Sequence, residues 1–307
     1  MTNLEWLLQG DPVVNRLTRK YLLDELVHDL SEGFIDQYLQ RYDNETKTWG
    51  NGYYGPKWTS TNYTLLDLRY MEIDPQHPIY QESLINYLNH YFKKYIDKQG
   101  IAVMDQCITG MFVKLLSYGN VHDHRMQTMI NYLLDVSMSD GGWNCLWNHS
   151  SLPTISSVHT TINVLEGLDE YVKRGYTYRT DEVTNAIHRA VDMLLSRHLL
   201  FIRNTQRPIH PSFLDHHFPP RWKYDYLRIL EFLAQIKYPY HPNMQPALDV
   251  LVNHFKAGKL TKGTMISGRI HFQLENEKYG RFNTFRGYRV LKQYAPELFQ
   301  RMMHETY

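Results

Sequence analysis

A short motif recurs five times along this chain of 307 residues and limits the folds open to it. Each copy has an apolar residue, then leucine, then usually a charged residue, and it lies in a segment with helical spacing of its apolar positions. The repeated leucines are Leu66, Leu116, Leu165, Leu230 and Leu291, so successive copies are 50, 49, 65 and 61 residues apart. This pattern predicts a repeated unit of turn, inner helix, loop and outer helix.

Two kinds of helix alternate in this pattern. The predicted outer helices are amphipathic, with one polar face, and span residues 84–96, 126–134, 183–195 and 244–255. The predicted inner helices carry fewer charges and span residues 59–71, 108–118, 158–171, 221–236 and 283–294. Only residues 270–274 suggest a short strand. The predicted fold class is therefore all-α.

Gly/Trp turns and prolines mark the boundaries between the helices. Trp49-Gly50 and Asp140-Gly-Gly-Trp143 are turns that lead toward inner helices, and Asp11-Pro12 suits a helix N-terminus. The longest irregular stretch, residues 204–220, contains four prolines. Because the repeat continues beyond it, we expect an ordered loop over the starts of inner helices rather than a domain linker.

Charge and composition exclude several classes of protein. The chain has 33 Lys and Arg and 32 Asp and Glu, a formal net charge of +1, which provides no field to attract nucleic acid. The first residues lack a signal-peptide pattern, and no apolar run approaches the roughly 18 residues of a membrane helix. Two cysteines, Cys107 and Cys145, cannot form a disulfide framework. We expect a cytoplasmic protein with no nucleic-acid partner and no transmembrane segment.

The Asp140–Trp143 turn and the segment Ser157-Val-His159-Thr-Thr161 resemble a known superfamily. They are similar to the α/α-toroid superfamily of squalene-hopene-type terpenoid cyclases and protein prenyltransferase β subunits. Residues 56–61 and 221–228 resemble bacterial members of uncharacterised function more closely still, and the resemblance covers residues 49–294. It implies an α-α barrel of inner and outer helices in one domain, 1–307, with N-terminal helices in residues 1–42 and helix hairpins in 43–307.

The alternative architecture is an open solenoid, as in other helical repeats. Inner helices that are apolar on several faces need neighbours all round, which favours a closed ring. Closure requires the helix pair that begins near Arg281 to pack against the N-terminal third of the chain.

The chain also departs from this superfamily. The Asp-x-Asp-Asp motif with which its cyclases protonate an alkene is absent, and so is the Asp-Asp-x-x-Asp motif of ionising terpene synthases. The Arg/Lys pair that precedes the zinc-binding Asp of prenyltransferases is missing before Asp105. Terpene cyclisation and diphosphate binding at this position are therefore not supported.

The two cysteines and His159 are the predicted metal ligands. Asp105-Gln-Cys107 followed by His159 resembles the order of the prenyltransferase zinc site, and Cys145 follows the Gly/Trp turn. Thiolate and imidazole suit zinc, and three protein ligands leave one position open for catalysis. The alternative is structural, with each cysteine a small buried apolar residue.

The remaining candidates lie where inner helices begin, because helix N-termini favour anions and would converge at one mouth of a barrel. The predicted catalytic residues are Asp105, His159 and Asp225, and the predicted substrate-binding residues are Trp58, Arg221, Trp222, Lys223, Tyr224 and Arg281. His210, His216 and His217 in the long loop are further acid–base or ligand candidates. Helix capping and surface ion pairing, such as Asp225 with Arg221 or Arg228, are the structural alternatives.

Three functions fit these expectations. The preferred one is an enzyme that acts on a hydrophobic or isoprenoid-like small molecule in the barrel, assisted by zinc. The second is an (α/α)-barrel carbohydrate-active enzyme with paired carboxylates among Asp105, Asp140 and Asp225. The third is a noncatalytic binding module that uses a concave helical surface.

Overall fold

The computed structural model describes residues 1–29, 31–95, 105–145 and 153–306. These residues form two compact units. Unit 1 comprises residues 1–40 and 195–307, and unit 2 comprises residues 41–194. The described residues contain helices and isolated β-bridges but no strand, and none of their helices is long and apolar enough to cross a membrane. The all-α prediction is confirmed.

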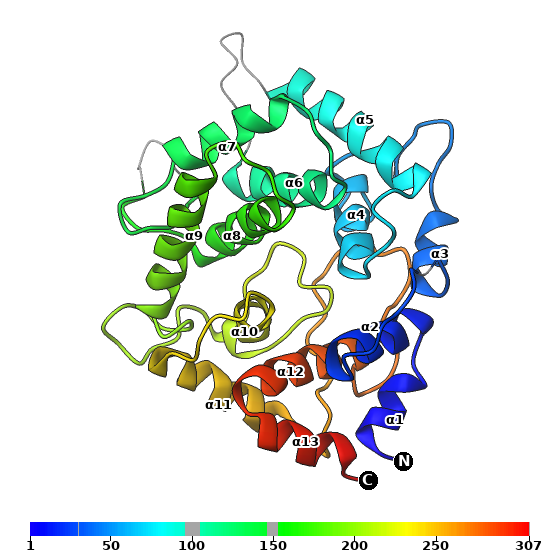
Figure 1. Cartoon of the computed structure of the whole chain (residues 1–307), viewed down its shortest axis with the longest axis vertical. Helices are drawn as coiled ribbons and strands as arrows, with labels where there is room; N and C mark the ends of the chain where they lie inside the picture. Colours follow the sequence, from blue (N-terminus) through cyan, green and yellow to red (C-terminus); the bar gives the residue numbers. More distant parts are fainter. Residues whose placement is uncertain (30, 96–104, 146–152, 307) are drawn as a thin grey trace. The chain divides into compact units, whose positions relative to one another are not determined.

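Unit 2 is built around a row of three inner helices. Its helices are α4 (Thr61–Tyr70), α5 (Pro78–Tyr95), α6 (Gln106–Tyr118), α7 (Arg125–Asp135), α8 (Val158–Lys173) and α9 (Thr180–Leu195). Helix α6 packs against α4 on one side and against α8 on the other, while α5 packs on α4 and α7 on α6 (Figure 1). Nearly every residue of α6 is buried, which agrees with its low charge content.

Two glycines allow α6 and α8 to approach closely. A Cβ atom on Gly110 would lie 2.5 Å from the Cα atom of Val164, and one on Gly167 would lie 2.2 Å from the Gly110 carbonyl oxygen. These obstacles are backbone atoms, which cannot rotate away as a side chain can. The small residues therefore determine how near these two inner helices lie.

Unit 1 joins the beginning of the chain to its last third. Its helices are α1 (Asn3–Leu8), α2 (Pro12–Leu22), α3 (Phe34–Leu39), α10 (Tyr226–Gln235), α11 (Gln245–His254), α12 (Arg281–Tyr294) and α13 (Pro296–His304), with 3₁₀ turns η1 (Pro211–Leu214) and η2 (Pro242–Met244). Helix α12 packs between α10 and α2, α13 packs on α12 and α1, and α11 packs on α10 (Figure 1).

Side chains from both ends of the chain connect these helices. Arg281 Nε donates to the carbonyl oxygen of Trp6 at 3.2 Å, and Asn3 Nδ2 donates to the carbonyl oxygen of Met302 at 2.8 Å. The expected packing of the helix pair near Arg281 against the N-terminal third is confirmed. The predicted N-terminus at Asp11-Pro12 is also confirmed, since Asp11 Oδ1 accepts from the amide of Val13 at 2.9 Å.

One hydrogen bond recurs at the start of three inner helices. The backbone N–H groups of Trp49, Trp143 and Leu260 donate to the hydroxyl oxygens of Thr61, Thr161 and Thr284, at 3.1, 3.1 and 3.0 Å. All three threonines are fully buried in the first turn or first residue of α4, α8 and α12. The repeated sequence motif is therefore accompanied by a repeated hydrogen bond, which occurs in both unit 1 and unit 2.

Two predicted elements differ from the structure. Residues 270–274 form no strand, because none of the described backbone pairs with them as a β-bridge. Helix α10 begins at Tyr226 rather than at residue 221, because the extended residue Asp225 caps it with its own carboxylate. Arg221, at the predicted start, has φ 55°, outside the right-handed helical region.

Candidate functional site

The two cysteines meet in unit 2. Cys107 is the second residue of α6, and its backbone N–H donates to the Sγ atom of Cys145 at 3.3 Å. The hydroxyl of Thr160, in the first turn of α8, donates to the same sulfur at 3.3 Å and accepts from the Cys145 amide at 3.3 Å. Both cysteines are half-buried. The structure thus brings together Cys107 and Cys145, as the sequence predicts.

The pKa values of the two thiols are shifted in opposite directions. The side-chain hydrogen bond with Cys107 lowers the pKa of Cys145, and hydrogen bonds from Thr160 and from the Cys107 amide lower it further. The same thiol–thiol hydrogen bond, followed by burial, raises the pKa of Cys107. Cys145 is therefore the sulfur that ionises first, at the N-terminal end of α6, where the helix dipole favours an anion.

Aromatic rings border this cysteine pair. The hydroxyl of Tyr63 donates to that of Tyr54 at 3.0 Å, and Trp58 packs edge-on against Tyr63 with ring centroids 4.8 Å apart. Burial, with smaller contributions from Cys107, Asp105 and Cys145, raises the pKa of Tyr54 to about 12. Trp58 and Asp105, both predicted site residues, therefore lie near the cysteines, with Asp105 at the exposed N-cap of α6.

His159 occupies the first turn of α8 beside Thr160. Adjacent helical residues project about 100° apart, so His159 and Thr160 leave the helix in different directions. Among the residues outside the three undescribed internal segments, no group of three or more His, Cys, Asp or Glu side chains is arranged to hold a metal ion. Zinc at Cys107, Cys145 and His159 stays a prediction.

In unit 1, the long loop places His217 against the start of α10. His217 Nδ1 lies 3.2 Å from Asp225 Oδ2, while Asp225 Oδ1 accepts from the backbone N–H of Arg228 at 2.8 Å. Both side chains are buried. The expected position of residues 204–220, near the starts of inner helices, is confirmed for α10 by this contact and for α12 by Phe218, which stacks on Phe282.

The ionisation state of Asp225 determines which ring nitrogen of His217 carries a proton. Burial opposes ionisation, but the hydrogen bond from His217 and the nearby charge of Arg286 hold the pKa of Asp225 below its usual value. An ionised carboxylate only accepts hydrogen bonds, so Nδ1 of His217 must carry the proton. In the neutral imidazole Nε2 is then an acceptor, and it has no hydrogen-bond partner among the described residues. This is the arrangement of an oriented general base.

A buried ion pair supports the His217 backbone. Arg286, whose side chain is fully buried in α12, donates from Nε to Glu231 Oε2 at 2.7 Å. Its Nη1 donates to the His217 carbonyl oxygen at 2.9 Å and to Asn283 Oδ1 at 3.0 Å. The loop is therefore tied to both α10 and α12, so the position of His217 is fixed from two inner helices.

Aromatic side chains extend from His217 across unit 1. Phe218 stacks on Phe282 with ring centroids 4.1 Å apart, Phe282 lies 6.0 Å from Phe34, and Phe34 stacks on Phe272 at 5.9 Å. Phe282 is fully buried, whereas the other three rings are half-buried. We call these four residues the phenylalanine row. It provides an apolar surface that begins next to the His217–Asp225 pair.

The predicted substrate-binding residues of unit 1 have different surroundings. Tyr224 is buried and donates its hydroxyl to the Leu199 carbonyl oxygen at 2.6 Å. Arg281 lies over the ring of Trp6, 4.7 Å from its centroid, so its guanidinium holds α1. Arg221 is largely buried, and Trp222 and Lys223 are half-buried in the approach to α10. Like Arg281, these last two are half-buried, whereas Trp58, Arg221 and Tyr224 are buried.

The other candidate side chains already have structural partners. Arg228 donates to the carbonyl oxygens of Arg221 and Lys223, which fixes the turn before α10. His216 contacts the Tyr226 hydroxyl at 2.8 Å and the Thr261 carbonyl oxygen at 3.0 Å. His210 is exposed and caps η1. Asp140 accepts hydrogen bonds from the amide and hydroxyl of Ser156.

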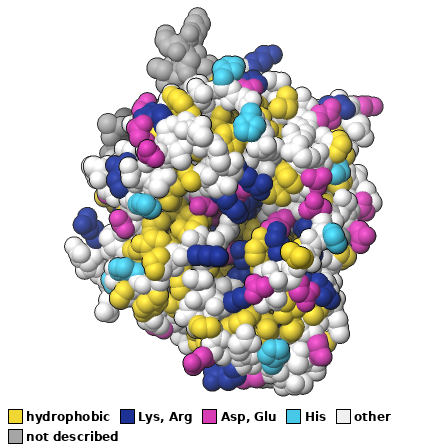
Figure 2. All heavy atoms as spheres, viewed as in Figure 1, with side chains coloured by type: hydrophobic (Ala, Val, Ile, Leu, Met, Phe, Trp, Pro, Cys, Tyr) yellow, Lys and Arg dark blue, Asp and Glu magenta, His cyan; other side chains and the backbone are white. Residues whose placement is uncertain are grey.

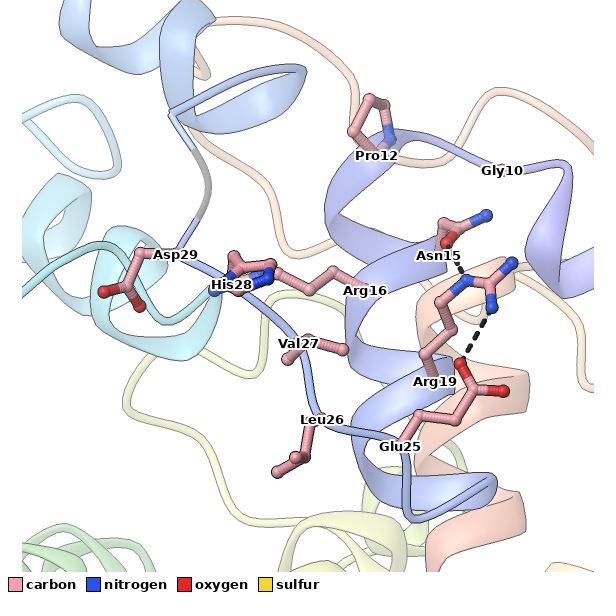
Figure 3. A pocket seen from close by; sticks show the side chains of 10 residues that line it. All are labelled: Gly10, Pro12, Asn15, Arg16, Arg19, Glu25, Leu26, Val27, His28 and Asp29. Atoms are coloured by element: carbon pink, nitrogen blue, oxygen red, sulfur yellow. Dashed lines mark hydrogen bonds and ion pairs between the residues drawn. The ribbon is translucent and has the colours of Figure 1, made fainter.

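A separate hollow of about 560 Å³ lies beside α2 in unit 1, lined by residues of the α1–α2 turn, of α2 and of the segment 25–29. Arg16 points toward His28, and Arg19 is held between Asn15 and Glu25 (Figure 3). Basic and acidic side chains are interspersed over α2 and α12 (Figure 2). None of the predicted site residues lines this hollow.

Several residues of these sites were not singled out from the sequence. Tyr63 lies near the cysteines, and Glu231 and Arg286 hold His217. The amino-acid sequence contains one indication of the Glu231–Arg286 ion pair. Both residues are charged, yet they lie in helices that are predicted to be buried, where a charge needs a partner. Comparison with known proteins finds neither a family model nor a curated protein that matches this chain.

Proposed function

We propose that this protein is an enzyme of the α/α-toroid type that performs acid–base chemistry on a hydrophobic or isoprenoid-like small molecule. His217 is the group that transfers the proton. The inner helix rows α4–α6–α8 and α10–α12–α2, each with outer helices packed on it, support the toroid expectation.

The observation that carries this proposal is the buried His217–Asp225 pair. The Asp225 carboxylate orients the imidazole and stabilises the imidazolium that forms when Nε2 accepts a proton. The contact of Arg286 with the His217 carbonyl holds the loop in place during this transfer. A histidine held in this way can remove a proton in one step and return it in the next.

The phenylalanine row supports an apolar substrate. Its rings begin at Phe218, the neighbour of His217, so an apolar chain lying on the row would present one end to the imidazole. Rings also stabilise positive charge that develops on carbon. Lys223 and Trp222, half-buried next to Asp225, are suitably placed to contact a polar end of the same molecule.

Binding and chemistry are tested separately. N-phenyl-1-naphthylamine, an uncharged apolar fluorophore, should bind the full chain and be displaced by farnesol but not by maltose. Phe218→Ala should weaken binding of the probe, whereas His217→Gln should leave it nearly unchanged. Displacement by maltose, or no binding of the probe at all, would contradict the substrate class.

Proton transfer is followed in deuterium oxide by mass spectrometry. Isoprenoid alcohols, ketones and acids that displace the probe are incubated with the protein, and incorporation of deuterium at carbon is measured. Wild type should accelerate incorporation into at least one compound, and His217→Gln should lose about two to four orders of magnitude of that rate. The control is His188→Gln, an exposed histidine on α9. Equal rates for wild type and His217→Gln would exclude His217 as the base.

A further inference from the structure

The cysteine pair of unit 2 has a chemistry that the proposed function does not use. Cys107 and Cys145 are 38 positions apart in the sequence, yet the Cys145 sulfur accepts a hydrogen bond from the Cys107 amide at 3.3 Å. We propose that Cys107 and Cys145 form a reversible disulfide, which makes this pair a dithiol–disulfide site that glutathione disulfide can oxidise.

The geometry requires only a small adjustment. A disulfide needs two Cα atoms within about 7 Å and sulfurs that can reach about 2.05 Å. The Cys145 sulfur already lies against the backbone of Cys107. Rotation about the Cα–Cβ bond, χ1, moves each sulfur without moving the backbone. Rotation of the two side chains can close the bond while α6 stays in place.

The surroundings select Cys145 as the attacking sulfur. Its Sγ atom accepts from the Cys107 N–H and from the Thr160 hydroxyl, and both donors stabilise negative charge on sulfur. Both cysteines are half-buried, so a small oxidant can reach them while a second protein molecule is hindered. Purely structural packing would be expected to bury both thiols fully.

The reaction is balanced by the oxidant. The Cys145 thiolate attacks one sulfur of glutathione disulfide, which forms a mixed disulfide and releases one glutathione thiolate. The Cys107 sulfur then attacks Cys145 in that mixed disulfide and releases the second glutathione. The proton of the Cys107 thiol passes to a departing glutathione. The protein loses two hydrogen atoms, and glutathione disulfide becomes two molecules of glutathione.

This inference is independent of the proposed function, because it concerns other residues in the other unit. The disulfide would join the first turn of α6 to the segment after the Gly/Trp turn, beside Tyr54 and Tyr63. Closure would also remove the thiolate that accepts the Thr160 hydrogen bond. The redox state of the pair would therefore alter the surroundings of these tyrosines.

The experiment equilibrates the full chain in glutathione buffers of increasing oxidised fraction, quenches it with acid and maps it without reduction. We expect a Cys107–Cys145 cross-linked peptide, loss of both free thiols and restoration of both by excess reduced glutathione. The midpoint should fall within the range of cellular glutathione ratios. Two stable mixed disulfides, an intermolecular cross-link or thiols that stay free at every ratio would overturn the proposal. Stoichiometric zinc that protects both thiols would overturn it as well.

Variants identify the order of attack. Cys107→Ser should accumulate a glutathione mixed disulfide on Cys145, whereas Cys145→Ser should react much more slowly at Cys107. Thr160→Val should slow the first step about threefold to tenfold and leave the final disulfide unchanged. Far-ultraviolet circular dichroism checks that each variant is folded. If Cys107→Ser fails to fold, the wild-type peptide map decides the proposal alone. Faster reaction at Cys107 than at Cys145 would contradict the assignment of the attacking sulfur.

Discussion

The backbone N–H of Trp143 donates a hydrogen bond of 3.1 Å to the hydroxyl of Thr161, and both residues are fully buried. Trp49 with Thr61 and Leu260 with Thr284 repeat this contact. In each case, a residue that lies 12, 18 or 24 positions earlier in the chain is attached to a threonine at the beginning of an inner helix. The contact fixes the position of the earlier segment against the first turn of the inner helix.

Replacement of Thr161 by valine should destabilise the protein by about 1–3 kcal/mol, because the buried Trp143 amide loses its acceptor while side-chain volume is kept. Thr61→Val and Thr284→Val should have effects of similar size. Urea unfolding followed by circular dichroism measures each. Thr205→Val, at an exposed site, is the control. No loss of stability in all three variants would show that the repeated contact is not energetically important.

The close approach of α6 and α8 predicts that alanine is poorly tolerated there. Gly110→Ala or Gly167→Ala must push the helices apart, because the added methyl group meets backbone atoms, and should cost about 1–3 kcal/mol or more. The control is Gly55→Ala, where a Cβ atom has no neighbour within 4 Å. Thermal unfolding of the three variants tests this, and equal midpoints for Gly110→Ala and Gly55→Ala would contradict it.

The buried ion pairs of Glu170 lead us to expect that unit 2 loses stability in acid. Burial opposes its charge, but Arg69 and Arg174 hold its pKa at about 2, against 4.5 for the unperturbed group. A lowered pKa means that the stabilisation is fully present above about pH 4.5 and is lost as the pH falls through about 2. Wild type should lose about 3 kcal/mol of unfolding free energy through this group across that window.

Glu170→Gln should be less stable than wild type at neutral pH by a similar amount, because Arg69 is left buried without its carboxylate. The difference between the two proteins should shrink toward pH 2. Glu182→Gln, in an exposed pair with Arg179, should show no resolvable change. A difference between wild type and Glu170→Gln that stays constant from neutral pH to pH 2 would be inconsistent with this linkage.

Asp225→Asn should change the tautomer of His217. The asparagine amide can donate to Nδ1, which then becomes the acceptor, and the proton moves to Nε2. Nitrogen-15 spectra of the imidazole should show protonated Nδ1 in wild type and protonated Nε2 in the variant. His188 should be unaffected by the substitution. Protonated Nε2 in wild-type protein would contradict the orientation on which the proposed base depends.

Helical periodicity predicted nine helices of this structure in type and approximate position, because each had enough apolar residues at three- and four-residue spacing. It placed the start of α10 too early, since nothing local distinguishes Arg221 from a helical residue until Asp225 caps the helix. Helix α13 was not among the predicted segments. Its signals were Pro296 at the first position and the spacing of Phe299, Met302 and Met303.

The site was less predictable than the fold. Helix starts pointed to Asp225 and Cys107, and the Gly/Trp turn pointed to Cys145. The predicted proximity of the two cysteines is confirmed by the contact of the Cys107 amide with the Cys145 sulfur. The partner of Asp225 comes from an irregular loop, whose path depends on the buried contact of Arg286 with the His217 carbonyl. Sequence spacing carries no information about such a long-range contact, so three histidines of the loop remained equal candidates.

Unit 1 is assembled from residues 1–40 and 195–307, and this has a consequence for synthesis. At roughly 5–20 residues per second, α1 to α3 leave the ribosome on the order of 10–30 seconds before the first residues of the segment they pack against. During that interval the amphipathic helix α2 lacks α12, its partner from the later part of unit 1, whereas unit 2 becomes complete. We expect nascent chains halted after residue 194 to expose to chaperones the side of α2 on which α12 packs in the complete protein. In the same chains unit 2, which is made after α2, is already folded.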